Sequence, residues 1–102
     1  MTKFRTLDEF KRSLAEAAPP AQLSVPLASL WWMGKGDWKR AHDLVDDAKG
    51  RTEAWVHAHL HRVEGDLPNA RYWYAQAGRA PADGSLEYER DMMAKTIIEG
   101  EV

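Results

Sequence analysis

Three histidines stand at alternate positions in the middle of the chain, at His57, His59 and His61. On a helix, His57 and His61 lie one turn apart on one face, whereas His59 points elsewhere. Glu53 lies four residues before His57 and Glu64 lies three residues after His61, so the face carries a continuous titratable stripe. A histidine pair at this spacing, with a carboxylate, can bind a divalent metal, and a histidine beside a carboxylate can move protons.

A fourth histidine, His42, lies on the preceding predicted helix, and three aspartates follow it within five residues. The chain has no HExxH motif, no second set of residues at metal-ligand spacing and no glycine-rich phosphate loop. We therefore expect helix-interface histidines that are hydrogen-bonded to neighbours, with no bound metal or cofactor and no catalytic residues. The alternative is a small-molecule or metal-binding protein, or a minor enzyme, with a site made of His42, His57, His61 and Glu64.

The helices that must position these histidines are marked by a six-residue phrase that occurs twice. Residues 36–41 and residues 65–70 both begin with Gly-Asp and end with Ala, and they lie 29 residues apart. Each copy follows one apolar, aromatic helical stretch and precedes another. A repeat of this kind is typical of helix pairs stacked side by side.

Local signals predict where the helices begin and end. Thr6 and Glu9 fit a capping box at the start of the first helix, and the prolines at 19–20 end that helix. Four glycines fall where helical periodicity stops, and we expect them in turns: Gly36, Gly50, Gly65 and Gly78.

Together these signals predict an all-α fold of six short helices, arranged as stacked antiparallel pairs. The chain is expected to form one domain over residues 1–102. The predicted repeat units are residues 23–49 and 52–82, and the predicted capping helices are residues 6–18 and 85–99. Caps are needed because each repeat buries its apolar face only against its neighbours.

The two units share a pattern, carried by Trp32, Gly36, Asp37, Trp38, Ala41, Val45 and Ala48 in one unit and by Ala58, Gly65, Asp66, Leu67, Ala70, Tyr74, Ala77 and Pro81 in the next. This pattern resembles the tetratricopeptide repeat family, whose period is about 34 residues. The resemblance implies that Ala41 and Ala70 lie at the closest approach of paired helices. Residues 54–62, with the residues around Tyr72, are also similar to small bacterial proteins that have no assigned activity.

The tetratricopeptide resemblance also implies a binding surface, because the first helix of each pair lines a concave groove in that family. The residues placed on this groove are Leu30, Met33, Trp55, His59 and Arg62. The intervals from Trp55 to His59 and to Arg62 keep these three side chains on one helix face. Trp and Arg are enriched in binding hot spots, so we expect this surface to contact a partner if neither terminal helix covers it.

Composition excludes several other classes of protein. The net charge of −2 argues against a nucleic-acid or membrane-surface partner. No stretch is long and apolar enough to span a membrane or to act as a signal peptide. The absence of cysteine excludes thiolate metal sites and favours the cytoplasm. The sequence therefore favours a protein- or peptide-interaction module over an enzyme, and its partner can be a second copy of the chain.

Overall fold

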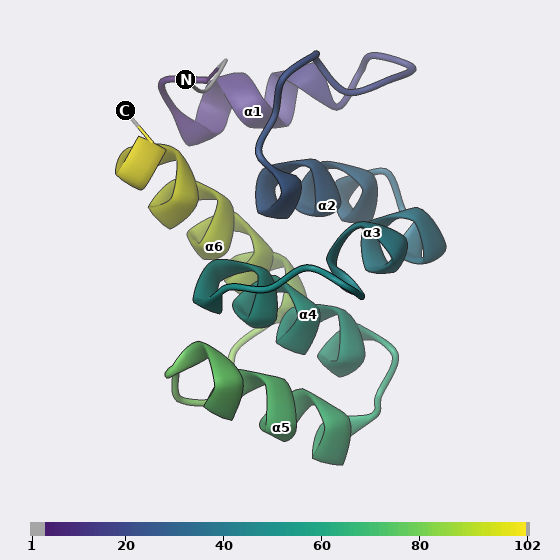
Figure 1. Cartoon of the computed structure of the whole chain (residues 1–102). Coiled ribbons are helices and arrows are strands. Elements are labelled where there is room, and N and C mark those ends of the chain that lie inside the picture. Colours follow the sequence, from purple (N-terminus) through teal and green to yellow (C-terminus); the bar gives the residue numbers. More distant parts are fainter. Residues whose placement is uncertain (1–3, 102) are drawn as a thin grey trace.

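The computed structural model describes residues 4–101, and this part of the chain is all-α with no strand. Figure 1 shows α1 at one end of the molecule and α5 at the other. The all-α prediction is confirmed. The described part of the chain forms six helices, which are α1 (Leu7–Ser13), α2 (Val25–Gly34), α3 (Trp38–Val45), α4 (Arg51–Val63), α5 (Leu67–Ala77) and α6 (Leu86–Glu101).

The repeated Gly-Asp phrase forms the same turn in both copies. Gly36 and Gly65 have φ angles of 81° and 85°, in the left-handed region that glycine adopts at least cost. The following residues, Asp37 and Asp66, each accept a hydrogen bond from a backbone N–H in the first turn of α3 and α5. The glycine therefore stops one helix and the aspartate starts the next, as the sequence predicts.

The first helix is shorter than the predicted span of 6–18, although its capping box at Thr6 is present. After Ser13, the backbone continues with i to i−3 hydrogen bonds, such as that from Leu14 N to Lys11 O at 3.2 Å. The Ser13 hydroxyl also donates to the Phe10 carbonyl at 2.6 Å. These tighter local bonds end the α-helix before the two prolines do.

The helices pack as two tight pairs with the terminal helices laid across them. The helix α2 pairs with α3, α4 pairs with α5, and α3 contacts α4. The terminal helix α6 contacts α1, α2 and α4 (Figure 1). Its buried residues Met93, Ala94, Ile97 and Ile98 belong to one core cluster together with residues of α1, α2, α3 and α4. The face of α2 and α4 that was expected to form an open groove is therefore covered by α6.

The small residues of the two phrases lie at helix contacts. Ala41 and Ala70 are buried, with 0% and 2% of their surface exposed, and the Ala41 carbonyl accepts a hydrogen bond from the Ser29 hydroxyl of α2 at 2.7 Å.

We expect Ala41→Leu or Ala70→Leu to lower the free energy of unfolding by about 1–3 kcal/mol through overpacking. Urea denaturation measures this, with exposed Ala75→Leu as the control. Unchanged stability in both variants would contradict the predicted helix contacts.

Candidate functional site

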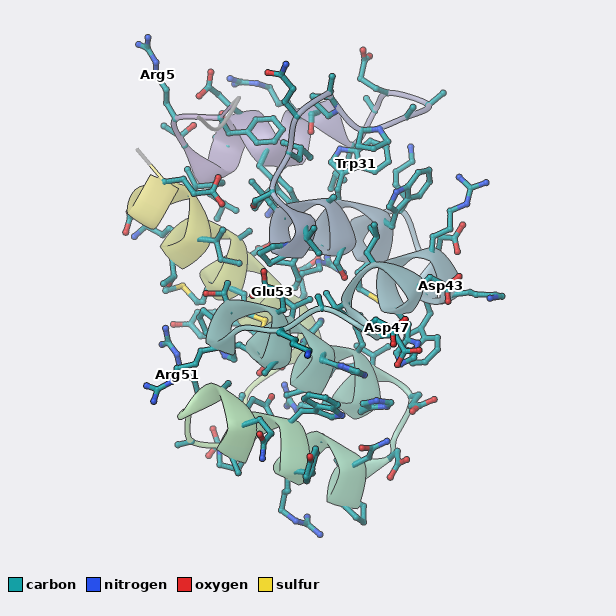
Figure 2. The ribbon with its side chains drawn as sticks, in the orientation of Figure 1. Arg5, Trp31, Asp43, Asp47, Arg51 and Glu53 are labelled. Atoms are coloured by element: carbon teal, nitrogen blue, oxygen red, sulfur yellow. The ribbon has the colours of Figure 1, made fainter. Side chains whose placement is uncertain are left out.

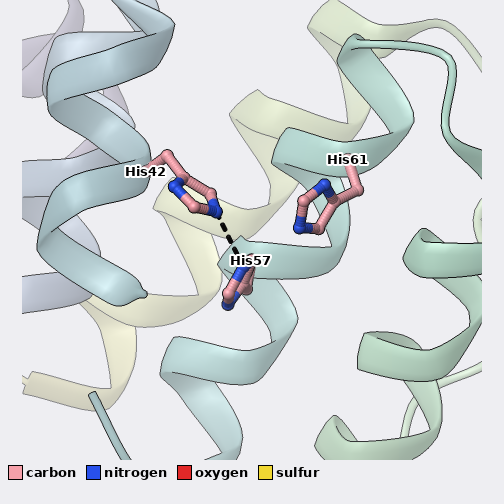
Figure 3. A group of neighbouring side chains, drawn as sticks. All are labelled: His42, His57 and His61. Carbon is pink, nitrogen blue, oxygen red and sulfur yellow. Dashed lines mark hydrogen bonds between the residues drawn. The ribbon is translucent and has the colours of Figure 1, made fainter. Parts of the chain in front are cut away.

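Three imidazole rings meet between α3 and α4. His42 comes from α3, and His57 and His61 come from successive turns of α4 (Figure 3). One ring nitrogen from each histidine lies within 4.8 Å of the other two. His57 Nε2 and His42 Nε2 are 3.1 Å apart and are joined by a hydrogen bond. We call His42, His57 and His61 the histidine triad.

Aromatic rings hold the triad from two sides. Trp38 stacks on His42 with ring centroids 4.7 Å apart and an interplanar angle of 9°. Trp73 of α5 stacks on His57 at 4.0 Å and 14°. The Trp38 indole N–H donates to the Leu60 carbonyl of α4 at 2.7 Å, which fixes that ring between the helices. The imidazole planes are thus set by packing as well as by hydrogen bonds.

The triad is mostly shielded from solvent. His57 is 2% exposed and His61 is 6% exposed, which confirms the prediction that both face neighbouring helices. His42 is only partly buried, with 19% of its side-chain surface accessible, so it lies where the cluster meets solvent. Of the three triad side chains, His42 of α3 is therefore the one most accessible to solvent.

Glu64 determines where the proton of His61 resides. The Glu64 carboxylate lies 2.5 Å from His61 Nδ1, and an ionised carboxylate can only accept a hydrogen bond. His61 Nδ1 therefore carries the proton, and in the neutral ring the lone pair is on Nε2. The Asn69 amide lies 3.4 Å from this Nε2 atom, at the long limit of a hydrogen bond.

His57 is held in its neutral form. Burial, the largest cause, and the neighbouring His61 and His42 together lower its pKa to about 4, whereas Asp46 acts in the opposite direction. His57 Nδ1 is buried and has no hydrogen-bond partner among residues 4–101. In Figure 3, one ring nitrogen of His57 points toward His42 and the other points away from it.

A second buried polar network links α4, α5 and α6, and Glu89 of α6 is its centre. Glu89 Oε1 lies 2.7 Å from His59 Nδ1 and accepts a hydrogen bond from Arg62 Nη1 at 3.0 Å. The Tyr74 hydroxyl donates to the other carboxylate oxygen. Burial raises the pKa of Glu89, but the hydrogen bonds from His59, Tyr74 and Arg62 outweigh it and leave this pKa below its ordinary value.

Because of this network, the predicted contact surface on α2 and α4 is not an open groove. Leu30 and His59 are buried, at 0% and 1% exposure, and Arg62 is turned inward to Glu89. Met33 and Trp55 are partly buried against the core. The prediction of an open groove is wrong for Leu30, His59 and Arg62, because α6 brings both apolar residues and a matching carboxylate to that face.

Sequence reasoning identified the three histidines and Glu64 but not the residues around them. The predicted site contains neither Trp38 and Trp73 nor Asn69 and Asp46. Asp46 Oδ1 lies 3.8 Å from His42 Nε2. The usable signal was the second Gly-Asp phrase, since it places Asn69 at the start of α5, the helix that also carries Trp73.

No family model, curated protein or solved structure matches this chain. Within residues 4–101, none of the helices has the length and apolar character needed to cross a bilayer.

Proposed function

We propose that this chain is a metal-binding protein whose histidine triad binds one divalent transition-metal ion, with zinc as the reference ion. The observation that carries the proposal is the convergence of three ring nitrogens within 4.8 Å. Zinc–nitrogen bonds are about 2.0–2.1 Å long, so two ligands of a tetrahedral ion lie about 3.3 Å apart. The 3.1 Å separation of the His42 and His57 nitrogens fits this geometry.

The protonation of the rings supports the same proposal. Metal ligation needs neutral imidazoles, and the pKa of His57 lies near 4 because of burial and its histidine neighbours. His61 keeps its proton on Nδ1 for Glu64, so its Nε2 lone pair can bind an ion in place of the long contact with the Asn69 amide. In metal sites, a histidine that binds the ion through one ring nitrogen usually donates a hydrogen bond from the other nitrogen, often to a carboxylate.

The triad leaves room for a fourth ligand. Three protein ligands with one open position are typical of catalytic zinc sites, whereas structural sites are closed by four. Asp46 is the nearest carboxylate to His42, and 56% of its side-chain surface is exposed. A bound ion would therefore complete its coordination with water or with the Asp46 carboxylate.

Metal titration tests the proposal directly. Protein purified without a tag and freed of metal is expected to bind one zinc ion per chain by calorimetry. His42→Gln should weaken binding by more than about 100-fold, since even an outer partner contributes about 10–100-fold. His59→Gln is the matched control, because His59 lies on the same helix but outside the triad. No stoichiometric zinc binding, or equal affinity in His42→Gln, would refute the proposal.

Glu64 gives a second, independent prediction at the same site. Glu64→Gln should weaken zinc binding by about 10-fold or more, because a neutral amide makes His61 a less basic ligand. Glu53→Gln, at the other end of the α4 carboxylate stripe, is the control and should bind zinc like the unmodified chain. Equal zinc affinities in the two variants would show that Glu64 has no role in orienting His61.

An interaction function is the second candidate, and a surface hollow favours it. Trp55, Arg79, Tyr88 and Met92 line a hollow of about 390 Å³, and the Arg79 guanidinium lies 3.8 Å above the Trp55 ring. Tyr88 is 63% exposed. In this proposal the stacked pairs act as a tetratricopeptide-like, cytoplasmic module that binds a protein or peptide, a second copy included. Tyr88→Ala should then reduce self-association or peptide capture without lowering stability.

A further inference from the structure

The histidine triad adjoins a separate open hollow of about 540 Å³. Its lining consists of residues 46–51, Ala54, Tyr72, Trp73 and Gln76. Figure 2 shows Asp47 and Arg51 at the two ends of the segment that joins α3 to α4. Its volume lies within the range of small-molecule sites, about 300–1,000 Å³.

Two residues belong to both the hollow and the surroundings of the triad. Trp73 lines the hollow and stacks on His57 at 4.0 Å. Asp46 lines the hollow, and its carboxylate lies 3.8 Å from His42 Nε2. A molecule in the hollow would therefore contact Asp46 and Trp73, the two residues through which the hollow meets the triad.

The aromatic wall of the hollow suits a flat ring. Tyr72 and Trp73 stand at 87° to each other with centroids 5.1 Å apart. Tyr72 is 56% exposed, so much of its ring is free to receive a ligand. Aromatic side chains prefer offset-stacked or edge-to-face partners, and this corner offers one surface of each kind.

The charges of the hollow favour an anion once an ion is bound. Two carboxylates, Asp46 and Asp47, balance the two cations, Lys49 and Arg51. No carboxylate of residues 4–101 lies within ion-pair distance of Lys49 or Arg51. Neutral imidazole ligands add no charge, and the Glu64 carboxylate beside His61 adds one negative charge. A bound divalent ion therefore leaves the hollow and the triad together with an excess of one positive charge.

From these contacts we propose that the hollow binds a small aromatic acid, a flat ring that bears a carboxylate or phosphate. The ring lies against Tyr72 and Trp73, and the anionic group faces the metal ion and the cations Lys49 and Arg51. This inference rests on the proposed metal site, because without the ion the charges of the hollow cancel.

Calorimetry on the full chain tests the inference, with benzoate and phenyl phosphate as probes and with zinc affinity measured separately. At least one probe should bind zinc-loaded protein at least about tenfold more tightly than metal-free protein. Cyclohexanecarboxylate and inorganic phosphate test the need for the flat ring, and both should bind more weakly. A comparison of the two aromatic probes distinguishes a carboxylate site from a phosphate site.

Variants at exposed positions separate this site from the metal site. Tyr72→Ala should weaken the aromatic acid about threefold to tenfold while zinc affinity stays unchanged, and Lys49→Gln/Arg51→Gln should also weaken it. Tyr88→Ala is the matched control, because Tyr88 is also exposed, at 63% against 56% for Tyr72, but lines the other hollow. Zinc binding with no aromatic-acid binding, or equal affinities in Tyr72→Ala and Tyr88→Ala, would overturn the inference alone. Failure to bind zinc would overturn the metal site as well.

Discussion

Replacing Glu89 with alanine is expected to lower the free energy of unfolding by about 3–5 kcal/mol, the cost of removing one partner from a buried charge network. Total stabilities of single domains lie near 5–15 kcal/mol, so the variant should lose a large share of its stability. For a domain of this size, the melting temperature should fall by about 12 °C or more.

The size of this effect follows from what the substitution leaves behind. Glu89 is 6% exposed and accepts hydrogen bonds from three side chains, those of His59, Arg62 and Tyr74. Tyr74 and His59 are themselves buried at 2% and 1% exposure. Without the carboxylate, the buried Tyr74 hydroxyl and His59 ring lose this partner. The partly buried Arg62 guanidinium loses one acceptor while it keeps the Gly84 carbonyl. Each unsatisfied buried group costs about 1–3 kcal/mol.

Glu87→Ala is a matched control on the same helix, because Glu87 is exposed and its nearest cation, Arg90, lies 3.8 Å away. Exposed pairs of this kind contribute about 0–1 kcal/mol. Urea denaturation of both variants measures the difference. If Glu89→Ala were no less stable than Glu87→Ala, α6 would be held by its apolar residues alone, and the network would not secure it.

The position of α6 is the main feature that the sequence did not predict. Trp55, His59 and Arg62 do lie on one face of α4, as their spacing indicates, but spacing cannot identify what covers that face. An amphipathic helix with Met93 and Ile97 on its apolar side can pack against several apolar surfaces. Glu89 was the informative residue, since one carboxylate beside that apolar side has to meet buried donors.

The helix boundaries and the histidine pair were predictable because local rules decide them. A glycine with positive φ followed by a capping aspartate ends one helix and begins the next in both copies of the phrase. The i, i+4 spacing of His57 and His61 fixes their shared face. The third member, His42, joins the triad because α3 packs against α4. The sequence could suggest this packing only because the two helices follow one another in the chain. Trp73 joins the site through the packing of α5, so its role emerges in three dimensions.

The metal-free protein is expected to lose about 2 kcal/mol of stability when the pH falls from 7 to 5, and His57 is the cause. Burial, His61 and His42 lower its pKa to about 4 in the folded chain, whereas an unfolded histidine titrates near 6.5.

The sign of this dependence follows from which state takes up the proton. Between pH 6.5 and pH 4 the unfolded chain binds a proton at His57 that the folded chain excludes, so acid favours unfolding. The stabilising contribution is complete above pH 6.5 and is lost as the pH falls toward 4. The groups that face His57 are His42 and Asp46 from the α3 side, His61 on α4 and the uncharged Trp73 ring of α5.

His57→Phe isolates the contribution, because phenylalanine keeps a flat ring against Trp73 but cannot take up a proton. Urea denaturation of metal-free protein at pH 7 and pH 5 should show the loss in the unmodified chain and a much smaller loss in His57→Phe. The lower limit of pH 5 keeps the measurement above the range in which Glu89 titrates, since its pKa lies below the ordinary glutamate value. An equal loss in the two proteins would mean that His57 is accessible to protons in the folded state. The proposed metal ion would then have to displace a proton from His57 in order to bind there.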